Sequence, residues 1–202
     1  MTRLLVLNFF PAFYPPSSGG EQRYFHVYHH LSRRYDVTLL SPTFPHHREE
    51  VVEFNTSFRE HRIPKEQIHV ELHRDLDAQS IGQECSALVC ALAAKSETAY
   101  HRRYRALVPH ADIVVHDSPF MVDYDEQLGK DGKPRVYNSY NVEASLMQQM
   151  LEGPHKARYV SLIGELEARL VGASKLVFAT SNAEREMFVE RYGCDSGKLA
   201  VA

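Results

Sequence analysis

The chain has 202 residues, of which 44% are hydrophobic and 24% are charged. This length and composition allow a substantial buried core, so they exclude long disorder as the main feature and favour one large domain over two small ones. The 23 basic and 26 acidic side chains give a formal net charge of -3. The chain therefore lacks the broad positive field that nucleic-acid binding needs, and we expect no nucleic acid among its partners.

The N-terminal apolar run stops at Pro11, which makes it too short for a signal peptide. No other stretch reaches the roughly 18 apolar residues of a membrane-spanning helix, so we expect a cytoplasmic protein. The three cysteines are odd in number and lack CxxC spacing, which favours thiols over a disulfide framework. They are Cys85, Cys90 and Cys194.

Twelve histidines raise the question of a metal site. The pairs His29-His30 and His46-His47 are sequence neighbours, and adjacent positions on a helix point about 100° apart. Neither pair is suited to chelate one ion, so we expect no metal.

In chain order, short β-rich runs alternate with helical or turn-rich stretches. The expected strands are 3–8, 36–41, 68–72, 112–116, 135–139 and 175–180, and a further strand begins in the last residues. The expected helices are 20–33, 79–107, 142–152, 155–172 and 182–192. Residues 42–67 have weak periodicity and are interpreted as variable loop and edge structure. The alternation predicts an α/β fold, namely a Rossmann-like, doubly wound, mostly parallel sheet with helices on both faces.

The stretch "PPSSGGEQR" separates the first expected strand from the first expected helix. Glycines allow the backbone to approach a ligand closely, and the start of a helix presents free N–H groups and a positive dipole end. Gly19 and Gly20 therefore form a candidate diphosphate site, although the pattern is neither GxGxxG nor a P-loop. The alternative is that the two glycines only make a turn.

In a doubly wound sheet, ligands bind beyond the carboxyl ends of the strands. His116, Asp117 and Ser118 follow the strand at 112–116. They form either an acid/base pair or simply a polar start of a loop.

The segment "YNSYNVE" follows the next strand and offers Asn138, Tyr140, Asn141 and Glu143 for hydrogen bonds to sugar hydroxyls. The alternative for Asn141 is that it caps the following helix.

Ser181 follows the last of the six strands, with Glu184 and Arg185 nearby. Ser181 is a candidate for substrate binding. Its alternative role, too, is to cap a helix.

The order of these motifs resembles the N-terminal half of a GT-B glycosyltransferase of the large retaining family 4. The resemblance rests on "PPSSGGEQR", "YDVTLLSP", "NVE" and "ELEARLVGASKLVFATSNAEREMFVERYG". It spans most of the chain and is weakest over 44–105.

The resemblance implies that Gly19 and Gly20 face the diphosphate of a nucleoside-diphosphate sugar. Glu21, Gln22 and Arg23 would line the cleft, although Arg23 could instead pair with a surface carboxylate. Many relatives have a histidine where this chain has Tyr140.

Tyr140 and His116 are therefore the candidate catalytic residues. Asp117, Asn138, Asn141, Glu143 and Ser181 are the candidate substrate-binding residues.

The resemblance further implies a retaining hexosyltransferase that moves a sugar to a hydroxyl acceptor and needs no cofactor beyond the nucleotide sugar. The C-terminal domain of that family has no counterpart in residues 1–202, so the chain would be an acceptor-side half that is inactive alone. The competing readings are a stand-alone binding module that pairs with another polypeptide, and a small hydrolase that uses His116 and Asp117.

The segment "AYHRRYRAL", residues 99–107, places three arginines beside two tyrosines in a helical context. Arg102, Arg103 and Arg105, next to Tyr100 and Tyr104, could touch anionic lipid at the inner face of a membrane. The alternative is an ordinary solvated helix face.

Overall fold

The computed structural model describes residues 1–79, 81 and 85–202. Its strands are β1 (Arg3–Leu7), β2 (Asp36–Thr43), β3 (Glu50–Asn55), β4 (Phe58–Pro64), β5 (Ile113–His116), β6 (Arg135–Asn138), β7 (Leu176–Ala179) and β8 (Leu199–Val201). Its α-helices are α1 (Gly19–Leu31), α2 (Gln67–Ala78), α3 (Ser86–Ala93), α4 (Ala99–Leu107), α5 (Glu143–Met150), α6 (Lys156–Ala173) and α7 (Asn182–Tyr192). Short 3₁₀ turns follow α4 and β5, at Val108–His110 and Pro119–Tyr124, and one precedes β8, at Ser196–Lys198.

The strands form one sheet in the order β3-β4-β2-β1-β5-β6-β7-β8. Each described pair is parallel except β3 and β4, which run antiparallel at one edge. The chain starts in the middle of the sheet, moves to one side and then crosses to the other, which defines a doubly wound sheet. The predicted fold class is confirmed.

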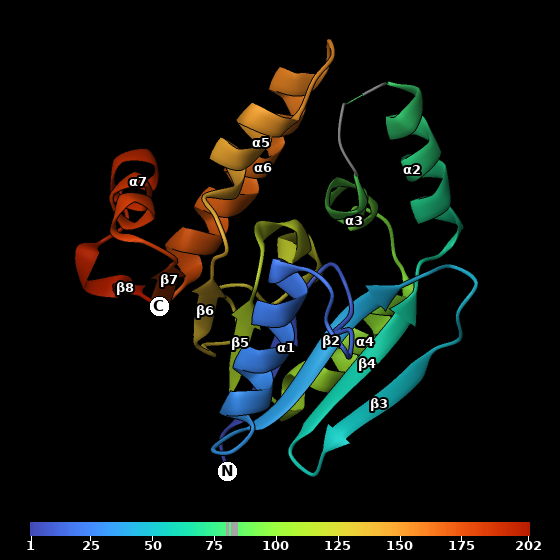
Figure 1. Ribbon diagram of the computed structural model, residues 1–202, viewed down its shortest axis with the longest axis vertical. Coiled ribbons are helices and arrows are strands. Elements are labelled where there is room, and N and C mark those ends of the chain that lie inside the picture. Colours follow the sequence, from blue (N-terminus) through green and yellow to red (C-terminus); the bar gives the residue numbers. More distant parts are fainter. Residues whose placement is uncertain (80, 82–84) are drawn as a thin grey trace.

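Residues of β1 alternate between two apolar layers, because successive side chains of a strand point to opposite faces. Leu4 and Val6 pack with helix α1, whereas Leu5 and Leu7 pack with residues of α4. Figure 1 shows α1 on one face of the sheet and α4 on the other. Right-handed crossovers place α5, α6 and α7, which connect β6, β7 and β8, on the α4 side.

The predicted strand at 68–72 is wrong, because this segment is part of helix α2. The strand interpretation rested on a short β-rich apolar run, but Val70 within it is 42% exposed. The side chains that pack inward are His69, Leu72 and Leu76, which follow a helical spacing.

The region 42–67 contains more regular structure than its sequence pattern indicated. Strands β3 and β4 form a hairpin there, and β3 is the edge strand with no buried residue. Only Val52 and Phe54 of this edge strand are half-buried, so its alternation is too short to stand out from the surrounding polar residues.

The single helix expected at 79–107 is also wrong, because α3 and α4 are separate helices. The part of this prediction that falls on residues 80 and 82–84 lies outside the described residues. In the described part of the chain, no helix combines the length and the apolar character needed to cross a bilayer.

The loop that follows β1 is held against the sheet by a buried ion pair on β4. Glu60 is fully buried and accepts a hydrogen bond from the backbone N–H of Ala12 at 2.8 Å. Arg62 donates to Glu60 at 2.7 Å and to the carbonyl oxygen of Ala12 at 2.8 Å. Both backbone groups of Ala12 are thus satisfied, which fixes the chain shortly before Gly19.

The start of α5 is capped by a side chain from α6. The fully buried carboxylate of Glu167 accepts hydrogen bonds from the backbone N–H groups of Glu143 and Ala144, at 2.9 and 3.0 Å. The hydroxyls of Tyr137 and Tyr192 also donate to it, at 2.8 and 2.6 Å. One carboxylate therefore joins β6, α5 and α7.

Replacement of Glu167 should be strongly destabilising. Glu167→Ala leaves four donors without their acceptor, so we expect the free energy of unfolding to fall by about 3 kcal/mol. Urea denaturation measures this loss. Glu165→Ala is the matched control, since Glu165 lies exposed on the same helix and its removal should change stability by less than about 0.5 kcal/mol. Equal losses in both variants would contradict the assignment.

Candidate functional site

The carboxyl end of β5 carries a buried carboxyl group, Asp117, that is surrounded by donors from three segments. The hydroxyl of Tyr28 on α1 donates to Oδ1, and so does the side-chain amide of Asn138 at the end of β6, at 2.8 Å. The hydroxyl of Tyr140 donates to Oδ2 at 3.0 Å. This polar cluster lies where a doubly wound sheet binds its ligands.

The protonation of Asp117 is finely balanced. Burial raises its pKa to about 6, because desolvation disfavours the charged form, although the bonds from Tyr28, Asn138 and Tyr140 oppose the shift. Burial and the nearby Asp117 charge raise the pKa of Tyr140 well above its usual value. The Tyr140 hydroxyl therefore keeps its proton at neutral pH and acts as a donor.

Arg23 extends this cluster toward the start of α1. Its guanidinium lies 4.7 Å from the centre of the Tyr140 ring and donates to Asn138 Oδ1 at 3.2 Å. This arrangement differs from the alternative in which Arg23 pairs with a surface carboxylate. It brings a cation close to Asp117, within the electrostatic reach that lowers the carboxyl pKa.

The glycine doublet forms the first two residues of α1. Ser18 caps the helix by accepting from the N–H of Glu21 at 3.2 Å. Among the described residues, nothing accepts a hydrogen bond from the N–H groups of Gly19 and Gly20. Both glycines are exposed, and a Cβ placed on either would meet no atom within 4 Å. These two amides therefore remain available at the positive end of the helix dipole.

Glu21 and Gln22 hold the loop that precedes the glycines. The Glu21 carboxylate accepts from Ser17 N at 2.6 Å and Ser17 Oγ at 2.8 Å, and these bonds lower its pKa. Gln22 donates to the carbonyl of Pro16 at 3.4 Å. Both side chains thus maintain the loop shape, and Glu21 also borders the cleft described next.

A cleft of about 340 Å³ opens beside Gly20. Its walls come from the loop after β1, the ends of β2 and β4, and the first residue of α3. Aromatic side chains dominate the lining together with Lys65: Phe9, Phe10, Phe13 and Phe44. Apolar rings with a few polar groups are typical of small-molecule sites.

His116 lies outside this exposed site. It is 0% exposed, and its Nε2 is 3.0 Å from Oδ2 of Asp125. Asp125 also accepts two hydrogen bonds from Arg135, at 2.8 and 2.9 Å. Burial would raise the Asp125 pKa, but the bonds from Arg135 and His116 outweigh it and hold this pKa well below its usual range. His116 and Asp117 thus bond to different partners, which does not support the hydrolase reading.

The side chains of Glu143 and Ser181 accept hydrogen bonds from neighbouring residues of the protein. Burial, followed by repulsion from Glu167, raises the Glu143 pKa to about 8. Asn141 donates to Glu143 at 3.4 Å, but Val142 is the N-cap residue of α5, so the capping alternative for Asn141 is wrong. Ser181 caps α7 and accepts from Glu184 N at 3.2 Å, as its alternative role predicts.

One polar side chain of this sheet edge, Asn8, escaped the sequence analysis, which did name Ser118. The side-chain Nδ2 of Asn8 and the hydroxyl of Ser118 are buried and have no hydrogen-bond partner among the residues described. Asn8 directly follows β1, so the rule of inspecting residues after each strand would have found it. The sequence analysis also gave no role in the site to Tyr28, whose hydroxyl reaches Asp117.

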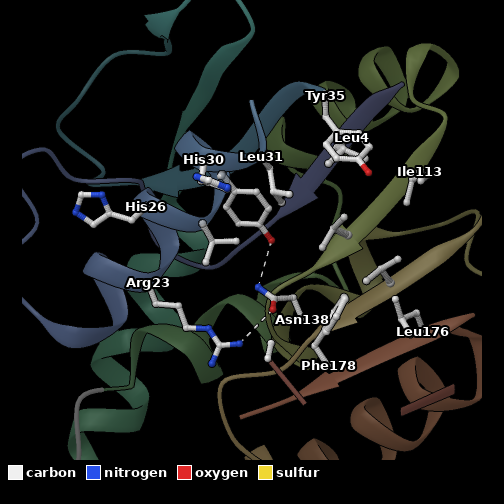
Figure 2. Close-up of a pocket in the computed structure, with 15 residues that line it drawn as sticks. Leu4, Arg23, His26, His30, Leu31, Tyr35, Ile113, Asn138, Leu176 and Phe178 are labelled. Carbon is white, nitrogen blue, oxygen red and sulfur yellow. Dashed lines mark hydrogen bonds between the residues drawn. The ribbon is translucent and has the colours of Figure 1, made fainter. Parts of the chain in front are cut away.

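A second cavity, of about 790 Å³, lies on the open face of the sheet beside α1. Figure 2 shows the apolar side chains of Leu4, Ile113 and Leu176 along this groove, with Arg23 and Asn138 meeting near one end. The groove follows the face of the strands, whereas the polar cluster sits at their carboxyl ends. Arg23, Tyr28 and Asn138 of the cluster line one end of this groove, whereas the aromatic cleft lies beside Gly20. We place the candidate site at the carboxyl ends of the strands, around the cluster and the glycine doublet.

The arginines of α4 are engaged in ion pairs. Arg102 pairs with Glu66 at 3.2 Å and Arg103 with Glu49, while Arg105 pairs with both Glu97 and Glu126. Tyr100 and Tyr104 are buried, so they do not flank the arginines on the surface. These contacts favour the solvated helix face over a lipid-binding patch.

No protein-family model matches the chain. No curated protein matches its sequence. Similar folds do occur among solved structures. Sucrose-phosphate synthase from Thermosynechococcus elongatus has a TM-score of 0.62 at 13% identity, over 100% of this chain and 47% of that chain.

Two further structures show the same likeness. The α,α-trehalose 6-phosphate synthase of Burkholderia multivorans gives 0.54 at 14% identity, over 96% of this chain and 44% of that one. The catalytic domain of Starch Synthase IV from Arabidopsis thaliana, bound to ADP and acarbose, gives 0.56 at 9%, over 99% and 50%. The chain thus has the fold of one domain of GT-B glycosyltransferases and spans about half the length of these proteins.

The raised pKa of Glu143 predicts a pH-dependent stability. The folded state binds this proton more tightly than the unfolded chain, so the stabilisation is complete below the usual value of 4.5 and is lost as pH rises through about 8. Glu143→Gln keeps the acceptor for Asn141 without the charge. We expect it to unfold less readily than the wild type at about pH 9, by about 2 kcal/mol, and to differ little at about pH 4.

Chemical denaturation at both pH values measures this difference. Glu190→Gln is the control, since Glu190 is exposed on α7, and it should follow the wild-type pH profile. An unchanged pH profile in Glu143→Gln would contradict the burial argument.

Proposed function

We propose that the chain is the acceptor-side half of a retaining glycosyltransferase, which moves a hexose from a nucleoside-diphosphate sugar to a hydroxyl acceptor. One observation carries the proposal: the two unbonded amides of Gly19 and Gly20 lie at the start of the helix whose Arg23 joins the Asp117 cluster. Backbone donors at a helix N-terminus and a nearby guanidinium suit a diphosphate. The likeness of the fold to one domain of glycosyltransferases supports this assignment.

The transfer requires the bond between the anomeric carbon and the diphosphate oxygen to break while a bond to the acceptor oxygen forms. The acceptor hydroxyl passes its proton to the leaving diphosphate, on whose oxygen negative charge develops as the bond breaks. Gly19, Gly20 and Arg23 would stabilise this charge, which is the principal electrostatic demand of the reaction. The Tyr140 hydroxyl, held by Asp117, would orient the sugar.

The aromatic cleft beside Gly20 would receive the acceptor. Among the described residues Lys65 has no ion-pair partner, and it faces the same cleft as Phe9, Phe13 and Phe44. An acceptor with an apolar face and an anionic group would satisfy these side chains. The rest of the donor site would come from a second domain of the same protein, as the half-length match to the solved synthases suggests.

His116 takes a positioning role in this proposal. It is buried beneath the sheet edge and bonds to Asp125, so it would orient the end of β5 without touching the sugar. Glu143, Asn141 and Ser181 would likewise shape the segments that follow β6 and β7.

The glycine doublet provides the most direct test in a polypeptide that includes the second domain. Gly20→Val fits the fold, because a Cβ there meets no atom, but its methyl groups would cover the amides that face the diphosphate. We expect kcat/KM for sugar transfer to fall by about 100-fold, the usual effect of losing such donors. Release of nucleoside diphosphate from a panel of nucleotide sugars measures turnover.

Gly172→Val is the matched control, because Gly172 lies on α6 with equal free space. It should retain wild-type turnover. Unchanged turnover in a folded Gly20→Val variant would remove the loop from the site.

The Asp117 carboxyl predicts an acid limb in the activity profile. Its charged form, which holds Tyr140 and attracts Arg23, disappears as pH falls through about 6. We expect kcat/KM to decrease below about pH 6 in the wild type. Asp117→Asn should lower kcat/KM by about tenfold at neutral pH and abolish this acid limb.

Asp112→Asn is the control at the opposite end of the same strand. Arg3 holds the Asp112 pKa down at about 2, so this residue does not titrate in the relevant range. An acid limb that persists in Asp117→Asn would exclude Asp117 as its source.

A further inference from the structure

Helices α2 and α3 bring an imidazole, a carboxylate and a thiol together outside the transfer site. His73 and Asp77 are four residues apart on α2, so they share one face of this helix. Cys85 lies at the N-cap position of α3. One ligand atom from each residue can be chosen so that all three lie within 4.8 Å of one another.

The spacing of these groups is close to that of a tetrahedral metal site. Cys85 Sγ lies 3.7 Å from His73 Nδ1 and 3.8 Å from Asp77 Oδ1, and His73 Nε2 lies 3.5 Å from Asp77 Oδ2. Zinc bonds of about 2.0 Å to nitrogen or oxygen and about 2.3 Å to sulfur separate neighbouring ligand atoms by about 3.3–3.6 Å. These contacts use both ring nitrogens of His73 and both carboxylate oxygens of Asp77. With one donor atom from each residue the three lie within 4.8 Å of one another, so side-chain rotations that shorten the longest separation by roughly 1 Å would bring them to ligating distance.

We propose that His73, Asp77 and Cys85 bind a divalent transition-metal ion of the zinc class. A thiolate and an imidazole select such an ion over calcium or magnesium, which prefer oxygen ligands. Three protein ligands leave the fourth tetrahedral position for water. The Cys85 thiol gives up its proton when the metal–sulfur bond forms, so binding releases a proton to solvent.

The burial of the three residues suits this role. Cys85 is buried, whereas the side chains of His73 and Asp77 are 43% and 62% exposed, which provides an entry path. The residue after Cys85 is Ser86, the first residue of α3, which lines the same aromatic cleft as Gly20. The metal would thus fasten the start of α3 to α2 and stabilise one wall of the cleft.

Cobalt binding tests the site without reference to enzymatic activity. The purified protein, without an affinity tag, is treated with a chelator and a phosphine reductant and then titrated with Co²⁺. We expect one equivalent to bind with a thiolate-to-cobalt charge-transfer band in the near ultraviolet and with tetrahedral visible bands. Zn²⁺ should displace Co²⁺ and raise the melting temperature, because it binds the folded state.

Cys85→Ser should remove the charge-transfer band, and His73→Gln and Asp77→Asn should weaken binding by about tenfold or more. Cys194→Ser is the matched control, since Cys194 is also a buried cysteine, and it should keep the band and the affinity. If Cys85→Ser does not fold, Asp77→Asn decides, because the Asp77 side chain is exposed.

The proposal is overturned if no charge-transfer band appears, if the band survives in Cys85→Ser, or if Asp77→Asn binds as tightly as the wild type. Binding without the band would indicate surface histidines only, such as His29 and His46. A failure of the glycosyltransferase proposal leaves this result unchanged, because the test reads metal binding alone.

Discussion

The burial of the Asp117 carboxyl group is the constraint on which the site depends. A carboxyl group removed from water needs compensating donors, and no single segment supplies enough of them. Tyr28 reaches it from α1, Asn138 from the end of β6 and Tyr140 from the following loop. The requirement therefore joins three segments that are distant in sequence, and it places Arg23, which stacks on Tyr140, at the edge where a ligand would bind.

Two further buried carboxylates, Glu60 and Glu167, accept hydrogen bonds from segments that lie elsewhere in the sequence. Glu60 holds the loop before Gly19 through the backbone N–H of Ala12, and Glu167 provides the cap of α5 from a neighbouring helix. Each buried carboxylate satisfies backbone groups that have no partner within their own element. The loops that carry the candidate site are thus fixed by charge and hydrogen bonding, while the apolar layers hold the sheet itself. A rigid frame with free glycine amides is well suited to hold a diphosphate without reorganisation.

The sequence predicted the central elements well and the peripheral ones poorly. The strands β1, β2, β5, β6 and β7 each contain a run of apolar or β-favouring residues, which reveals them in the sequence. Helix α2 was taken for a strand because a five-residue window cannot separate the two periods. That error concealed the helical spacing between His73 and Asp77. The sequence analysis also placed Cys85 inside the single helix expected at 79–107, so it did not connect Cys85 with His73 and Asp77. The hairpin of β3 and β4 was hidden because only two side chains of the edge strand β3, Val52 and Phe54, are half-buried.

The sequence by itself determined the fold class, the exposed glycine doublet at a helix start, and the set of polar residues that follow the strands. Those features depend on local composition and on the rule that parallel strands present their carboxyl ends together. Only the tertiary structure decided which of these residues meet. It joined Asp117 to Tyr140 and Arg23, and it placed His116 beside Asp125 beneath the surface. It also showed that Glu167 of α6, rather than a residue next to α5 in sequence, accepts from the first N–H groups of α5. Such pairings depend on which donors, distant in sequence, pack around a buried charge. Local sequence patterns do not contain that information, because it arises only when the chain folds.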